Sequence, residues 1–253
     1  MSSLVIAFDP LCRLGDNQKA KELLERAISI QEQAYRPEHV EVAGTLNSLG
    51  NAFDDLGDYL KQKEFLERAY NVTKNEFGPG HTRFAHVCVA LAKARGGLKD
   101  GVRQQEYAQV AYDTYKLSMG PMHRLVASAL LELGNAQVQL GNASDAVPLL
   151  KLSHTIFERE LGMESAAAAK AMRSLGVAKG SLGEVIAAVE LLEGACSIFK
   201  CKFGPSHVQV EITISALQEL ASSFPEDYPF FLFLPPEDYN RAFFPKRKRA
   251  RIE

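Results

Sequence analysis

The sequence has 253 residues, of which 46% are hydrophobic and 24% are charged, so it predicts a packed protein rather than a disordered one. Its 29 basic and 31 acidic side chains nearly balance, for a net charge of −2, although five of the basic residues lie together between positions 245 and 251. No stretch approaches the roughly 18 apolar residues that span a membrane, and the first residues lack the basic lead and apolar core of a secretory signal. We therefore expect neither a membrane protein nor a secreted one.

The four cysteines fit the same expectation. Cys12 and Cys88 stand alone, and Cys196 and Cys201 are five residues apart, too far for one helix face. Because no C-x-x-C motif occurs, the sequence gives poor support to a zinc site or a dithiol redox site. We expect four reduced thiols in a cytoplasmic protein, with the nucleus as the alternative location.

In chain order, the dominant feature is a repeat of 42 residues that runs without insertion or deletion over roughly 200 residues. One column of the repeat consists of Leu14, Leu56, Leu98, Leu140 and Leu182. A histidine column consists of His39, His81, His123 and His207, with Ser165 in the fourth unit. This register predicts a stack of similar units, in which each unit packs against its neighbours.

Each unit is predicted to contain two helices. In the first full unit, apolar residues recur at three- and four-residue steps from Ala43 to Leu56, which is the period of an amphipathic helix. A Leu-Gly-Asp turn at 56–58 ends this helix, and a second one follows with Leu66 and Val72 facing inward. It ends near the Gly-Pro pair at 78–79, because proline suits the start of the next helix.

Small residues recur where two helices must approach closely. On the first helix of each unit these are Gly50, Ala92, Gly134 and Gly176. On the second helix they are Ala27, Ala69, Ala111, Ser153 and Ala195. A larger side chain at such a position would hold the helices apart, at a typical cost of about 1–3 kcal/mol.

These motifs resemble the tetratricopeptide repeat, with Leu-Gly-x-Ala on helix A, Leu-Gly-Asp at the turn and Ala-x-x-x-Leu-x-x-Ala on helix B. The usual repeat has 34 residues, and the eight extra residues with a Gly-Pro-x-His junction resemble the 42-residue variety of kinesin light chains. The resemblance covers roughly residues 14–222 and implies an all-α, right-handed superhelical solenoid. It also implies a non-catalytic scaffold or adaptor for protein binding. The heptad coiled coil of a full kinesin light chain is not present, so its attachment to the motor is not carried over.

The repeat boundaries divide the chain into seven predicted segments. These are an N-terminal segment with a partial repeat (1–36), repeat 1 (37–78), repeat 2 (79–120), repeat 3 (121–162), repeat 4 (163–204), a capping helix A (205–223) and an aromatic, proline-rich tail (224–253). The tail has three open interpretations: a docking segment for a partner, a segment that folds back onto the last helices, or an artefact of the gene model.

The resemblance also implies a ligand groove lined by helix A. The candidate peptide-binding residues are Asn47, Asn51, His86, Lys93, Asn135, Lys170 and Arg173. Three of them, Asn51, Lys93 and Asn135, are similar to the family's carboxylate clamp, whereas Asn47 stands where the clamp has a lysine. Because the later repeats contribute cations, we predict an extended peptide partner of acidic character. The alternative is a solvated face with no dedicated ligand.

The basic cluster Lys246, Arg247, Lys248, Arg249 and Arg251 resembles a nuclear import signal. The cluster could bind an import receptor, or it could contact nucleic acid directly, and the protein would then be a nuclear or nucleic-acid-associated factor. The third interpretation is that the cluster is a solvated charged end with no partner. Another alternative is a recognition subunit of a separate enzyme. We identify no catalytic, metal or cofactor site in the sequence. We interpret the histidine column as structural groups near helix N-termini, because stacked repeats would hold its members roughly 10 Å apart, which is too far for them to bind one metal ion.

Overall fold

The computed structural model describes residues 17–223, which form ten α-helices and no strand. The helices are α3 (Asn17–Ala34), α4 (Val40–Leu56), α5 (Tyr59–Phe77), α6 (Thr82–Gly97), α7 (Gly101–Met119), α8 (Arg124–Gln139), α9 (Ala143–Leu161), α10 (Ala166–Ser181), α11 (Val185–Phe203) and α12 (Val208–Ser222). The prediction of an all-α solenoid is confirmed.

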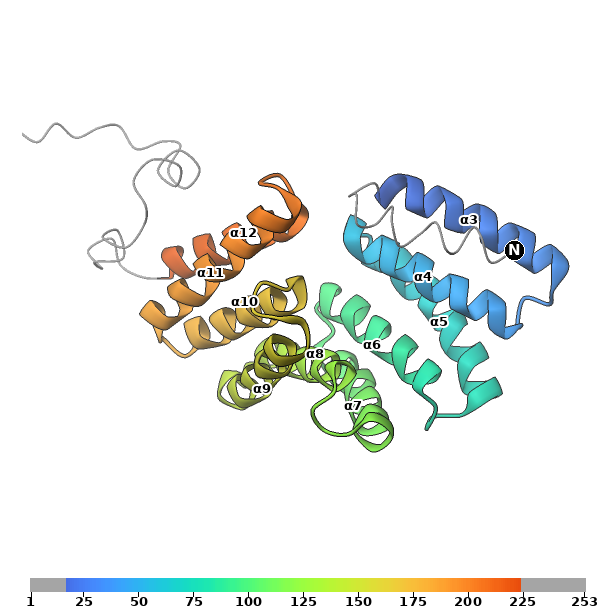
Figure 1. The fold of residues 1–253 in the computed structure, drawn as a ribbon, viewed down its shortest axis with the longest axis horizontal. Coiled ribbons are helices and arrows are strands. Elements are labelled where there is room, and N and C mark those ends of the chain that lie inside the picture. The colour runs from blue at the N-terminus through green and yellow to red at the C-terminus, as the bar shows by residue number, and fades with distance from the viewer. Residues whose placement is uncertain (1–16, 224–253) are drawn as a thin grey trace, which may run out of the picture.

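The helices form a curved array of hairpins. Each helix packs against its sequence neighbours, and α4, α6, α8, α10 and α12 also contact one another in succession along the array. Figure 1 shows the resulting arc, with α3 and α4 at one end and α12 at the other. The first helices of the hairpins therefore form one continuous layer, and the second helices form the other.

The histidine column caps the first helix of its hairpins. In each case the imidazole Nδ1 accepts a hydrogen bond of 3.1–3.2 Å from the backbone N–H two residues later, and the four residues are His39, His81, His123 and His207. Ser165 caps α10 instead through its hydroxyl oxygen, which accepts from the backbone N–H of Ala168, three residues later. This bond satisfies one of the free N–H groups at a helix start, so the structural interpretation of this column is confirmed.

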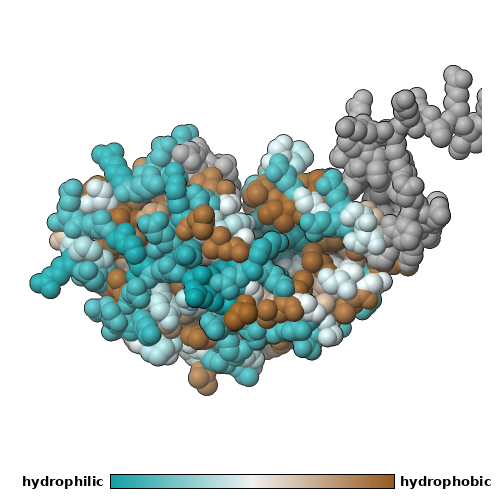
Figure 2. Space-filling model, turned by 180° about the vertical axis from the view of Figure 1, so that it is seen from behind, coloured by the Kyte–Doolittle hydropathy of each residue, from teal (hydrophilic) through white to brown (hydrophobic). Residues whose placement is uncertain are grey.

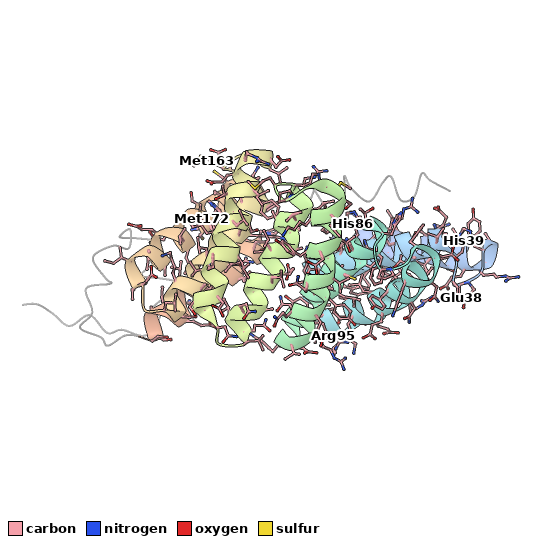
Figure 3. The ribbon with its side chains drawn as sticks, turned by 90° about the horizontal axis from the view of Figure 1, so that it is seen from below. Glu38, His39, His86, Arg95, Met163 and Met172 are labelled. Atoms are coloured by element: carbon pink, nitrogen blue, oxygen red, sulfur yellow. The ribbon has the colours of Figure 1, made fainter. Side chains whose placement is uncertain are left out.

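Three of the four histidines also stack on an aromatic ring at the end of the preceding hairpin. The ring centroids of Tyr35 and His39 are 4.5 Å apart, as are those of Phe77 and His81, and those of Phe203 and His207 are 4.4 Å apart. Figure 3 shows His39 at the start of α4, in this junction. The stack therefore ties the end of one hairpin to the start of the next.

The small residues of the repeat pair with complementary residues on the second helix. A Cβ atom built on the glycine would meet leucine side-chain atoms at 2.5–2.9 Å in three hairpins, namely Gly50 with Leu66, Gly134 with Leu150 and Gly176 with Leu192. Repeat 2 has Ala92 and Ala108 at these two positions, both fully buried. A larger residue on one helix is therefore matched by a smaller one on the other, which keeps the interior close-packed.

The leucine column at the end of the first helix is an exception to the predicted core. Leu56, Leu140 and Leu182 have exposed fractions of 41%, 38% and 44%, so the expectation that Leu56 continues the buried face of α4 is wrong. The chain turns directly after these leucines, at Gly57, Gly141 and Gly183, which all have positive φ angles. The turn leaves the leucine at the edge of the solenoid, where no neighbouring helix covers it fully.

Lys99 occupies the turn position that other repeats give to glycine. It has φ = 61°, which makes it the one non-glycine residue with a positive φ among residues 17–223. Because the left-handed conformation costs an L-residue roughly 1–2 kcal/mol, we expect Lys99→Gly to raise the free energy of unfolding by about 0.5–1 kcal/mol. Urea unfolding followed by circular dichroism measures this. The matched control is Gly141→Lys, which should lower the free energy by a similar amount; equal stability of all three proteins would contradict the prediction.

Candidate functional site

A continuous groove follows the layer formed by the first helices of the hairpins. It consists of three adjoining cavities of about 280, 190 and 570 Å³. Asn47 and His86 line both the first and the second cavity, and Lys93 and Ser128 line both the second and the third. The groove therefore extends from α4 to α12 without interruption. In the view of the opposite face, a cleft at the upper edge separates the α12 end from the α3–α4 end (Figure 2).

All seven candidate residues line this groove. Asn47, Asn51 and His86 lie in its first part, Lys93 lies where the second and third cavities meet, and Asn135, Lys170 and Arg173 line the third. Each comes from the first helix of a hairpin, at one of three repeat positions that lie three or four residues apart along the helix. The groove brings them together because this spacing places them on one helix face in every repeat.

The 280 Å³ cavity at the start of the groove is lined by one acid and one base, Glu41 and Arg83, so its charges balance. The side-chain oxygen of Asn47 is buried and has no hydrogen-bond partner among the described residues, so it is an acceptor available to a ligand N–H. His86 packs against the ring edge of Tyr115, with centroids 5.4 Å apart, and burial lowers the pKa of its imidazole. Figure 3 shows His86 and Arg95 towards opposite ends of α6; of these two, His86 lines the first two cavities.

The 570 Å³ cavity holds most of the charge. Its lining includes the cations Lys93, Lys99, Lys170 and Arg173 and the acids Asp54 and Glu132. The cations thus exceed the acids by two in this cavity, although the whole chain is slightly acidic. This excess attracts anionic groups, and it does so most strongly where water is partly excluded.

Arg173 is held in place by two contacts from neighbouring helices. Its guanidinium donates to Gln209 Oε1 of α12 at 2.7 Å and lies 5.5 Å from the centre of the Phe199 ring of α11. Burial lowers the pKa of Arg173 to about 10, against the opposing influence of Tyr59, Glu132 and Asp54. Arg173 therefore remains a cation at neutral pH, and its position is fixed before any ligand binds.

Two groups at the base of the cavity, Glu132 and Gln104, were not predicted from the sequence. Glu132 is only 5% exposed, and its Oε2 accepts a hydrogen bond of 3.0 Å from Gln104 Nε2. Gly96 makes room for this pair, since a Cβ atom there would lie 2.6 Å from Gln104 Nε2. The available signal was Gln104 itself, which replaces the alanine found at this helix B position in repeats 3 and 4.

Thiol and metal chemistry find little support in the described part of the chain. Cys88 and Cys196 are buried, Cys201 is exposed, and all three are free thiols, while Cys12 lies outside the described residues. Burial raises the pKa of the Cys88 thiol to about 12, which keeps it protonated and unreactive. Within residues 17–223, no three histidine, cysteine or acidic side chains gather as metal ligands would.

Comparison with known proteins agrees with this architecture. Residues 11–75 match the family model of the tetratricopeptide repeat. The chain folds as a tetratricopeptide repeat array. No curated protein matches the sequence.

Among solved structures, the tetratricopeptide array is similar to a protein of Podosopora anserina that is assigned as a kinesin light chain with nearly identical TPR-like repeats. The two sequences are 22% identical, the match covers 80% of this chain and 96% of that chain, and the TM-score is 0.60. The array is equally similar to BtubC (BKLC) from P. vanneervenii, at 22% identity over 79% and 80%, with a TM-score of 0.60. A Rap protein complexed with competence and sporulation factor gives 15% identity over 85% and 55%, with a TM-score of 0.63. At these identities the likeness establishes the fold.

Two other features of the tetratricopeptide array bear on its predicted surroundings. None of the described helices combines the length and hydropathy required to cross a bilayer. The basic cluster Lys246, Arg247, Lys248, Arg249 and Arg251 lies outside the described residues, as does the whole aromatic tail. The import signal, the nuclear location and the role of the tail therefore stay predictions.

Proposed function

We propose that this protein is a non-catalytic scaffold or adaptor that binds an extended, acidic segment of a partner protein in the groove. The observation that carries the proposal is the positive excess in the 570 Å³ cavity, at the end of a continuous groove with polar groups along it. Curved repeat arrays characteristically use their concave surface for binding, and charge-assisted bonds to carboxylates are stronger than neutral ones.

The two parts of the groove would have different roles. The amide groups of Asn47, Asn51 and Asn135 can pair with the backbone N–H and C=O groups of an extended segment, whatever its sequence. Lys93 and Lys170 would attract the acidic side chains, together with the prepositioned guanidinium of Arg173. Polar contacts along the groove would thus hold the segment, and the cations would select acidic sequences.

Neutralising two cations tests the proposal. We expect Lys93→Gln combined with Lys170→Gln to weaken the binding of a rhodamine-labelled hexa-aspartate peptide by about 10- to 100-fold and to reduce its salt dependence, because two attractive charges are lost. Fluorescence polarisation at several salt concentrations measures both effects.

The control is Lys63→Gln combined with Lys151→Gln. These lysines lie on α5 and α9, the second helices of their hairpins, and line none of the three cavities. This variant changes the net charge equally, so it should bind the peptide like the original protein. Equal affinities for both double variants, or no binding by the original protein, would refute the assignment of the groove.

A further inference from the structure

Glu132 is an acidic residue buried in a cavity that otherwise attracts acids. Its side chain lies on α8 at the base of the 570 Å³ cavity, is 5% exposed and is fixed by the hydrogen bond from Gln104. A buried carboxylate is costly unless it is paired. The position is occupied by Ser48, Ala90 and Ser174 in the other repeats, so the repeat architecture does not require a charge there.

The charged groups around Glu132 come from four helices and one turn. Burial raises the pKa of Glu132. Lys93 of α6, the hydrogen bond from Gln104 and Lys170 of α10 favour its ionised form, whereas Asp54 of α4 opposes it. Tyr59 of α5 and Arg173 of α10 complete the cluster, and Arg173 is itself influenced by Glu132. Lys99, in the turn before α7, also lines the cavity. Glu132 is thus a carboxylate on which both groove lysines act in the unliganded protein.

We propose that Glu132 is an internal counter-charge that competes with the acidic side chains of a bound segment for Lys93 and Lys170, and so sets the affinity of the groove. The inference rests on the proposed function, since it requires an acidic segment in this cavity. While Glu132 is ionised, it neutralises part of the attraction and repels the ligand at close range. When Glu132 is protonated, the same lysines are released to the ligand, and the groove binds more tightly.

The direction of the pH dependence follows from the burial of Glu132. Because its pKa is raised, it takes up a proton at a higher pH than an ordinary carboxyl group as the pH falls. Affinity for an anionic segment should therefore increase as the pH falls through this range. The same shift makes the ionised form costly to the folded protein, so the stability associated with Glu132 is present at low pH and is lost as the pH rises through its pKa.

The decisive variant is Glu132→Gln, which removes the charge but retains an oxygen that can accept from Gln104 Nε2. At the alkaline end of the range in which the protein stays folded, where Glu132 is ionised, we expect it to bind the rhodamine-labelled hexa-aspartate peptide roughly tenfold more tightly than the original protein. The matched control is Glu193→Gln on α11. The pKa of Glu193 is also raised by burial, but Glu193 lines none of the groove cavities, so its loss should leave the affinity unchanged.

A pH scan provides the second readout, with a peptide of cysteic acid residues as the probe because its sulfonates stay ionised. The affinity of the original protein should increase as the pH falls, and the advantage of Glu132→Gln should disappear at the lower end. His86 lies in the adjoining cavities and also gains a proton in acid, so the scan is repeated in a His86→Gln background to remove its contribution.

The outcomes separate the two proposals. Equal affinity of the original protein and Glu132→Gln, with weaker binding by the lysine double variant, would overturn the counter-charge and leave the proposed function intact. Weaker binding by Glu132→Gln, with an unchanged melting midpoint, would also overturn it, because Glu132 would then assist the ligand. Absence of binding by every variant would refute both proposals.

Discussion

Replacing Gly134 by alanine should lower the free energy of unfolding by about 1–3 kcal/mol, although alanine is the better helix former. A Cβ atom at this position would lie 2.5 Å from both Cγ and Cδ2 of Leu150, so either the leucine or the whole of α9 must shift. Leu150 is fully buried in the largest core cluster, which leaves it little room to adjust. Urea unfolding measures the loss.

The decisive comparison is a double-mutant cycle. Leu150→Ala alone should cost about 2–5 kcal/mol, because it leaves a cavity. The combined variant reproduces the pair found naturally in repeat 2, Ala92 with Ala108, and should therefore be less destabilised than the two single losses added together. Strict additivity would show that the glycine and the leucine are not matched to each other.

Replacing Phe199 by alanine should have the second large effect, a loss of about 3–5 kcal/mol. Its side chain is fully buried in α11, where it packs in a cluster with Ala169, Cys196 and Val210. The ring also lies beneath the guanidinium of Arg173 at 5.5 Å from its centre. Truncation thus removes core contacts and frees a groove cation at the same time, which connects packing to the proposed binding.

Phe199→Leu separates these two consequences. Leucine restores most of the apolar volume, so thermal unfolding should show a smaller loss, but it has no ring face for Arg173. We expect this variant to keep its fold and to bind the hexa-aspartate peptide several-fold more weakly. Full affinity in Phe199→Leu would show that Gln209 alone is sufficient to position Arg173.

Most of the fold could be predicted from the sequence, because each hairpin packs against its neighbours in the chain. The constant 42-residue offset places the helix ends, the histidine caps and the groove positions, and all seven candidate residues do lie along one groove. Leu56 was misplaced because the helical period predicts its face but gives no information on whether a neighbour covers the end of the helix.

The interactions among the charged groups of the 570 Å³ cavity could not be predicted from the sequence, for a different reason. The cavity brings Tyr59 of the first repeat into electrostatic contact with Arg173 of the fourth, across 114 positions in the sequence. That proximity depends on how strongly the array curves, which is a sum of small rotations between hairpins and has no signature at any one position. The sequence could therefore predict which residues face the groove but not which of them interact across it.

The ring stacks at the hairpin junctions have a mechanical consequence. They are present before α4, α6 and α12, whereas the junctions before α8 and α10 have Met119 and Leu161 where the others have an aromatic ring. The junctions before α8 and α10 thus lack the ring stacking that resists rotation of one hairpin against the next. We expect the array to bend mainly at these two junctions, so that the helices before α8 and the helices from α10 onward would each move as a rigid unit.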